Sequence, residues 1–272
     1  MKRQIKIGIL LSIIIGLTPA FVLAFSQATH LYIADHVFED SESKNDLYYG
    51  SIAPDIDFFV KHPEKWPTAF EDTHYNFVDL RSFAPTPSQR AFADGWFTHN
   101  ERDPWVADHY AHIDPAYVIT KAEKLTGIPL DFAHLAIEAA VDVLLKDNED
   151  AQLGKKLLKA LRHHSSKDRS LLTYVFVKNQ ERTNRPTLIL AETNFREIMV
   201  QYAKALSLPD PKNKKAIAKW GSMVARRLYR MKVPSEMLLN VLEDAIDLCK
   251  DDYKGAVEAV IEGIKDNITN DH

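Results

Sequence analysis

Apolar residues in the second half of the chain recur at the spacing of helices. After residue 145, four stretches have an apolar face and a polar face with a period near 3.6 residues. These stretches are residues 153–164, 186–206, 214–231 and 234–250. No stretch of useful length alternates with the period of two that strands show. The pattern therefore predicts an all-α fold, a compact multi-helix bundle.

The first half of the chain has shorter periodic stretches. Residues 26–39 have helical spacing, and residues 41–46, with the sequence SESKND, have the composition of a loop. The next apolar stretch is interrupted by Gly50 and Pro54. Because a proline disfavours helical geometry in the residue before it, we expect Asp55 where a helix ends or restarts.

Residues 1–24 have the pattern of a secretory signal peptide. A basic start, MKRQIK, is followed by a long apolar run that ends in small residues. Val22 and Ala24 suit the positions before a cleavage site, so we expect the mature chain to begin at Phe25 and to be secreted. The apolar run is also near the length that spans a membrane, so an uncleaved anchor is the alternative.

Composition limits the class of partner. At 272 residues and 46% hydrophobic residues, the chain can form one large domain or two small ones with a real core. Its net charge is −4, and it becomes about −7 without the basic signal segment. A protein that binds polyanions usually has a basic stripe, so nucleic acid is not favoured as a partner. Cys249 is the only cysteine, so an internal disulfide is excluded.

Two stretches, residues 95–112 and 131–142, contain candidate metal ligands. His134 and Glu138 are four residues apart and would project from the same face of a helix. His99 and Asp103 repeat this spacing, and His109 follows six residues later. Imidazole and carboxylate are ligands that a zinc-like divalent ion prefers. The repetition indicates a metal centre.

Two features leave the ligand set open. Pro104 disfavours helical geometry at Asp103, which can instead cap a new helix and still point into a site. His112 lies three residues after His109 and competes with it as a ligand. The sequence does not decide between these two histidines.

Histidines and acidic residues of the first half occur in the order His30, Asp55, His74, His99, Asp103, His109, His134, Glu138. In this order the chain resembles the zinc-dependent phospholipase C family, which is related to the single-strand-specific zinc nucleases. The segments that carry the resemblance are THLYIADHVF, GSIAPDIDF, THYNF, HNERDPWVADH and HLAIE. It covers roughly residues 25–142, and the last two segments are the most specific.

The resemblance implies an all-helical fold of the phospholipase C type and up to three zinc ions. One ion would be held by Asp55, His74, His99 and Asp103. A second would be held by His109, His134 and Glu138. The third would be held by His30, by Asp103 as a bridging carboxylate, and by the free amino group and carbonyl of Phe25.

Several details of the resemblance bear on the catalytic role and the substrate. Asp55 is the candidate general base, since a ligating carboxylate keeps a second oxygen, although the PDID register also admits Asp57. Phe25 lies five positions before His30, where the related nucleases have a Trp. The interval from His74 to His99 is shorter than in the family, and no counterpart of its headgroup-binding residues is evident. The headgroup is therefore not specified.

The resulting expectation is an exported zinc phosphodiesterase, a phospholipase C that releases diacylglycerol and a phosphorylated headgroup, with transient contact to a membrane surface. Residues 25–146 would form the catalytic region, and residues 147–272 a C-terminal helical region packed on the same domain. Glu138 as last ligand resembles the phospholipases, whereas the nucleases usually have Asp. The alternatives are a single-strand nuclease of the same superfamily and a non-catalytic helical protein stabilised by metal.

Overall fold

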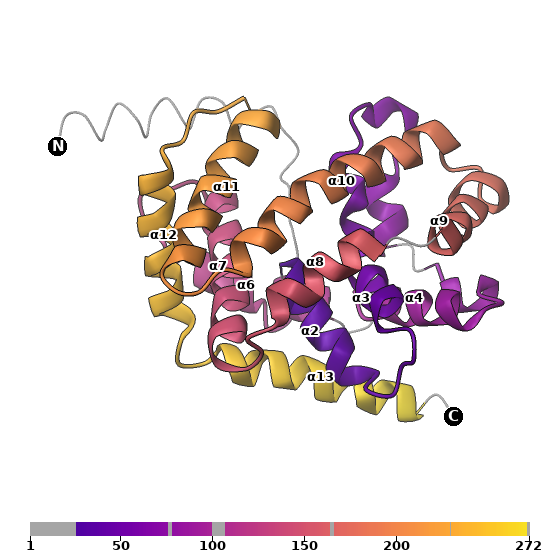
Figure 1. Ribbon diagram of the computed structural model, residues 1–272, viewed down its shortest axis with the longest axis horizontal. Coiled ribbons are helices and arrows are strands. Elements are labelled where there is room, and N and C mark those ends of the chain that lie inside the picture. The colour runs from indigo at the N-terminus through magenta and orange to yellow at the C-terminus, as the bar shows by residue number, and fades with distance from the viewer. Residues whose placement is uncertain (1–25, 76–77, 100–106, 164–165, 229, 271–272) are drawn as a thin grey trace.

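A computed structural model describes residues 26–75, 78–99, 107–163, 166–228 and 230–270, and within these ranges it contains helices and no strand (Figure 1). The all-α prediction is confirmed. The longer helices are α2 (Gln27–Val37), α3 (Lys44–Ile52), α4 (Pro87–Phe97), α7 (Leu130–Asn148), α8 (Leu153–His163), α10 (Arg185–Leu206), α11 (Lys212–Leu228), α12 (Ser235–Cys249) and α13 (Tyr253–Asn270). Shorter elements are η2 (Ala53–Phe59), η3 (Pro63–Lys65), η4 (Glu71–Tyr75), η5 (Leu80–Phe83), α5 (Ala107–His112), α6 (Tyr117–Ala122), α9 (Ser166–Leu172) and η6 (Thr173–Asn179).

Helix α2 lies in the interior of the bundle. It packs against α3, α7, α8 and α13, and Figure 1 shows α13 crossing beneath it. Its side chains are buried on more than one face, including Ala28, Leu31 and Ile33 on the apolar side and His30 among the polar residues. A helix covered all round belongs to the core. The segment that carries the first candidate ligand is therefore held rigidly.

Helices α3 and α4 pack at very short range through two glycines. A Cβ on Gly50 would lie 2.0 Å from the carbonyl oxygen of Phe92, and one on Gly95 would lie 2.0 Å from that of Leu47. Gly50 therefore lies inside α3 and does not interrupt it, so that part of the sequence interpretation is wrong. The reason is tertiary, because the glycine allows the backbones to approach.

The predicted helices of the second half are confirmed within about three residues at each end. Helix α10 begins where the side chain of Asn184 accepts a hydrogen bond from the amide of Thr187 at 2.9 Å, with Pro186 in the first turn. In the first half, the expected loop at 41–46 is shorter than predicted, since α3 begins at Lys44. The restart expected near Asp55 is confirmed, because α3 ends at Ile52 and the 3₁₀ segment η2 follows.

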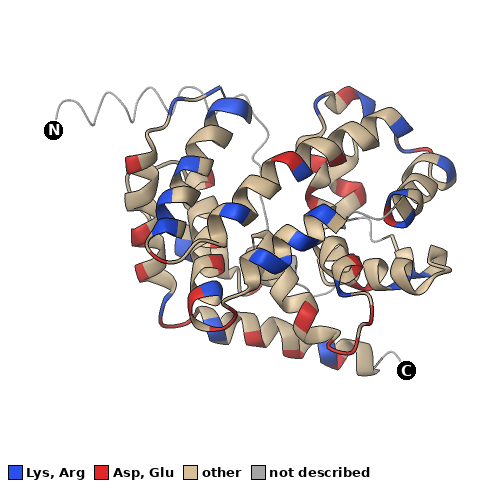
Figure 2. Cartoon of the chain, viewed as in Figure 1, with Lys and Arg blue, Asp and Glu red and all other residues tan. Residues whose placement is uncertain are grey.

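Charged side chains are spread over the surface. Figure 2 shows Lys and Arg on several helices, interspersed with Asp and Glu, rather than gathered in one stripe. Among the described residues, no helix is both long enough and apolar enough to cross a membrane.

Candidate metal centre

Three of the predicted ligands meet in the interior. One ligand atom from each of Asp55, His74 and His99 lies within 4.8 Å of the other two. The Oδ1 atom of Asp55 is 3.7 Å from Nε2 of His74 and 3.6 Å from Nε2 of His99. All three residues are at most 1% exposed. We call this set the first cluster; the family resemblance implied these three residues together with Asp103, which lies outside the described residues.

Local structure aims each of these side chains at the same point. Asp55 lies in the first turn of η2, directly after Pro54. His74 lies in the π-helical turn η4, and His99 follows the end of α4, whose last residue is Phe97. His99 therefore lies beyond the last residue of α4, and Asp103, its expected partner at the spacing of a helix face, lies outside the described residues. The two residues that follow α4 place the imidazole of His99 next to Asp55.

Hydrogen bonds to the far ring nitrogens set the orientation of the two imidazoles. Nδ1 of His99 lies 2.8 Å from the carbonyl oxygen of Ser51, which can only accept, so Nδ1 carries the proton. Nδ1 of His74 lies 2.8 Å from Oγ1 of Thr73. Each ring then presents Nε2 to Asp55. A histidine whose other nitrogen is held in this way is oriented as a metal ligand.

The carboxylate of Asp55 is held in its ionised form. Burial raises its pKa, but electrostatic attraction to the neighbouring imidazoles of His99 and His74 when they are protonated, together with a hydrogen bond from Gln27, outweighs burial and lowers it. Its second oxygen, Oδ2, accepts a hydrogen bond from Nε2 of Gln27 at 3.0 Å. Gln27 is 6% exposed and was not anticipated from the sequence. Because Gln27 is the first residue of α2, this contact shows that the start of α2 lies against the first cluster.

A second cluster consists of His112, His134 and Glu138. Their ligand atoms also lie within 4.8 Å of one another. The Nε2 atoms of His112 and His134 are 2.9 Å apart, and Nε2 of His134 lies 2.6 Å from Oε1 of Glu138. His134 and Glu138 lie on α7, so the same-face prediction for this pair is confirmed. His112, at the end of α5, was the open alternative to His109.

His30 lies beside the first cluster. Its ring stacks on that of His99 with centroids 3.9 Å apart and 17° between the planes, and the residue is fully buried. Asp57 is also buried, at 8% exposed, but only Asp55 joins the first cluster among the described residues. Three predicted ligands are not placed. Phe25 and Asp103 lie outside the described residues, as does the side chain of His109.

A buried acid on α7 positions the helix that carries His30. Asp142 is 0% exposed. Its carboxylate accepts hydrogen bonds from the amide of Thr29 at 2.8 Å, the hydroxyl of Thr29 at 2.6 Å and the hydroxyl of Tyr202 at 2.7 Å. It thereby satisfies donors at the start of α2. The sequence analysis missed this role, although an acid four residues after Glu138 within an apolar helix is a detectable signal.

The donor sets fit a metal ion. Each cluster offers two imidazoles and one carboxylate, a set that occurs in catalytic zinc sites with one position left for water or substrate. Both clusters are buried, except that His112 is half-buried, and a buried set of like donors is stabilised when a cation lies between them. The two clusters can therefore hold a metal ion each.

Comparison with known proteins identified no relative of this chain. No family model matches the chain, and neither a curated protein nor a solved structure with significant similarity was found. Function is therefore inferred from the donor sets and their surroundings.

Proposed function

We propose that this chain is an exported zinc-dependent phosphodiesterase, a phospholipase C that cleaves a phospholipid into diacylglycerol and a phosphorylated headgroup. The observation that carries the proposal is the presence of two buried clusters, each with two histidines and one carboxylate, formed by residues that occur in the order of that family. Catalysis by clustered dications suits a phosphodiester, because the substrate is anionic and further charge develops on its phosphoryl oxygens.

When bound, zinc would supply neutralisation of that charge and a water of lowered pKa. The chain's own residues orient the site. The Nδ1 contacts of His74 and His99 keep each Nε2 directed inward. Asp55 is the proposed general base, since its ionised Oδ1 faces the centre of the first cluster while Gln27 holds Oδ2.

The proposed start of the mature chain is consistent with this site. Gln27, two residues after Phe25, donates its side-chain amide to Asp55. Ser26 is 7% exposed, and its hydroxyl donates to that of Tyr202 at 3.3 Å. The amino terminus created by cleavage after Ala24 would therefore begin close to the first cluster. In our proposal its amine, with an ordinary pKa near 8, can lose a proton and complete the third site.

Phospholipid is favoured over nucleic acid as the substrate. A channel for single strands needs a basic groove with aromatic residues along it. The chain has an acidic balance, and Lys and Arg are interspersed with Asp and Glu on the described helices (Figure 2). Electrostatic attraction to a polyanion would be weak on such a surface.

The test is metal analysis of a protein that begins at Phe25, with hydrolysis assays on phosphatidylcholine, a soluble phosphodiester and single-stranded DNA. We expect bound zinc and cleavage of the phospholipid. Glu138→Gln should lower zinc per chain and the rate, whereas Glu258→Gln, at an exposed position of α13, should change neither. Faster cleavage of DNA would favour the nuclease, and zinc without any hydrolysis would favour a structural metal site.

The amino terminus can be tested separately. A protein extended by two residues before Phe25 should contain less zinc and turn over more slowly than the protein with the native start, with equal helical content. A peptide-bonded nitrogen is a poor zinc donor, whereas a free amine is a good one. Equal zinc and equal rates in the two proteins would contradict the role of the amine.

A further inference from the structure

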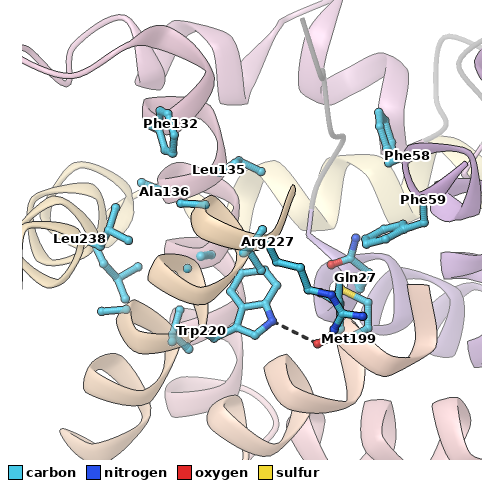
Figure 3. A pocket seen from close by; sticks show the side chains of 18 of the residues that line it. Gln27, Phe58, Phe59, Phe132, Leu135, Ala136, Met199, Trp220, Arg227 and Leu238 are labelled. Atoms are coloured by element: carbon cyan, nitrogen blue, oxygen red, sulfur yellow. Dashed lines mark hydrogen bonds between the residues drawn. The ribbon is translucent and has the colours of Figure 1, made fainter. Parts of the chain in front are cut away.

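A cavity of about 510 Å³ lies between helices α7, α10, α11 and α12 and the segment η2 (Figure 3). Its walls are mainly apolar and include Leu135, Met199, Trp220 and Leu238. Small-molecule sites usually measure about 300–1,000 Å³ and are lined mostly by apolar side chains with a few polar groups. The cavity has both properties, and none of the ligands of the two described clusters lines it.

Two side chains of the cavity wall also contact the first cluster. Gln27 lines the cavity and donates to Asp55 at 3.0 Å. Phe58 also lines it, and its ring centroid lies 5.8 Å from that of His74 in an edge arrangement. An occupant of the cavity would therefore be separated from the first cluster by only one layer of side chains.

Helix α7 connects the cavity with the second cluster. Phe132, Leu135, Ala136 and Ala139 line the cavity at the spacing of a single helix face. His134 and Glu138 project from another face of the same helix. Helix α7 thus carries both part of the cavity wall and two ligands of the second cluster.

Cationic side chains lie where the cavity meets solvent. Lys61, Arg227 and Arg230 line it and are all exposed. Arg227 also pairs with Glu197 at 3.1 Å, and Figure 3 shows its side chain extending toward the end that contains Gln27 and Met199. An apolar interior with a cationic rim is complementary to an amphiphile that has one apolar chain and an anionic head.

We propose that this cavity binds one acyl chain of the phospholipid substrate while the phosphate lies toward the cationic rim and the metal centre. The proposal rests on the proposed function and adds to it a selectivity for long-chain lipids. Extraction of a chain from the bilayer exposes it to water, and the cavity would provide an apolar environment in its place.

The test measures binding of lysophosphatidylcholines of increasing chain length to the zinc-loaded mature protein, below the concentration at which they form micelles. Each methylene buried in an apolar site contributes about 0.8 kcal/mol, which corresponds to a roughly fourfold gain in affinity. We expect the dissociation constant to fall by about that factor per methylene until the cavity is full. An affinity independent of chain length would overturn the proposal.

Substitutions in the cavity wall test whether the acyl chain binds there. Ala136→Phe places a ring in the cavity and should weaken binding of the longest chain at least about tenfold. Ala151→Phe, in the exposed turn between α7 and α8, should bind as wild type. Helical circular dichroism and zinc per chain verify that Ala136→Phe is folded. If it is not, Leu135→Gln, which makes the wall polar at similar size, replaces it. A folded variant with unchanged affinity would overturn the proposal.

Two further results separate this proposal from the proposed function. Chain-length-dependent binding without hydrolysis of any phosphodiester would support the lipid cavity and refute the phospholipase. Hydrolysis of the soluble phosphodiester, together with no binding of any lysophospholipid, would refute the cavity and leave the phosphodiesterase intact. A peptide of residues 7–24 serves as a competitor, since that segment is also apolar. If the peptide binds and the lipids do not, the proposal is overturned.

Discussion

Replacement of Asp142 by Ala should both destabilise the protein and lower its metal content. The buried carboxylate accepts from the amides of Ala28 and Thr29 at 3.3 and 2.8 Å, from the Thr29 hydroxyl at 2.6 Å and from the Tyr202 hydroxyl at 2.7 Å. The change leaves these donors without an acceptor in a part of the core that is fully buried. It also releases the start of α2, which carries His30.

The magnitude follows from the orphaned donors. Each buried donor left unsatisfied costs about 1–3 kcal/mol, and the substitution removes the acceptor of four neutral donors. Because Tyr202 and Thr29 can partly rearrange, we expect Asp142→Ala to lower the free energy of unfolding by about 3–5 kcal/mol. Asp142→Asn retains one acceptor oxygen and should cost roughly half as much.

Urea denaturation of the metal-free protein measures the stability, and metal analysis of the loaded protein measures the effect on the site. Asp266→Ala is the control, since this exposed residue of α13 should change the free energy of unfolding by no more than about 0.5 kcal/mol. A loss below about 1 kcal/mol for Asp142→Ala, with unchanged metal content, would refute the assigned role of this residue.

Three further predictions concern packing, pH dependence and the second cluster. Gly50→Ala should cost about 3 kcal/mol or more because its Cβ would lie 2.0 Å from a backbone oxygen, whereas Gly255→Ala, with nothing within 4 Å, should be neutral or stabilising by up to about 1 kcal/mol in urea denaturation. Burial raises the pKa of Asp35, but hydrogen bonds from two lysines outweigh it and lower the pKa to about 2. Its stabilising contribution is therefore fully present above its unfolded pKa near 4 and is lost as pH falls through about 2. Asp35→Asn should cost about 1–2 kcal/mol at pH 7 and only a small part of that at pH 2; an equal cost at both would contradict this. His112→Ala should lower metal content by about one ion per chain, unlike exposed His62→Ala, and equal metal in the two variants would exclude His112 as a ligand.

The sequence by itself determined the helical class and the features that depend on neighbouring positions. Amphipathic periodicity predicted α8, α10, α11 and α12 to within a few residues, since their apolar faces recur with the helical period. The pairing of His134 with Glu138 was predictable for the same reason, because residues four apart on a helix lie on one face. Pro54 likewise predicted that α3 ends before Asp55.

Tertiary structure alone decided the contacts between distant segments. Asp55 rather than Asp57 joins His74 and His99 because η2, η4 and the end of α4 meet at one point, which no local spacing encodes. Asp142 supports α2 from 113 residues away along the chain. Gly50, which reads as a helix breaker, remains helical because the backbone of α4 occupies the space of its missing side chain. Periodicity along the chain shows which face of a helix is buried, and only the packing of helices shows what that face contacts.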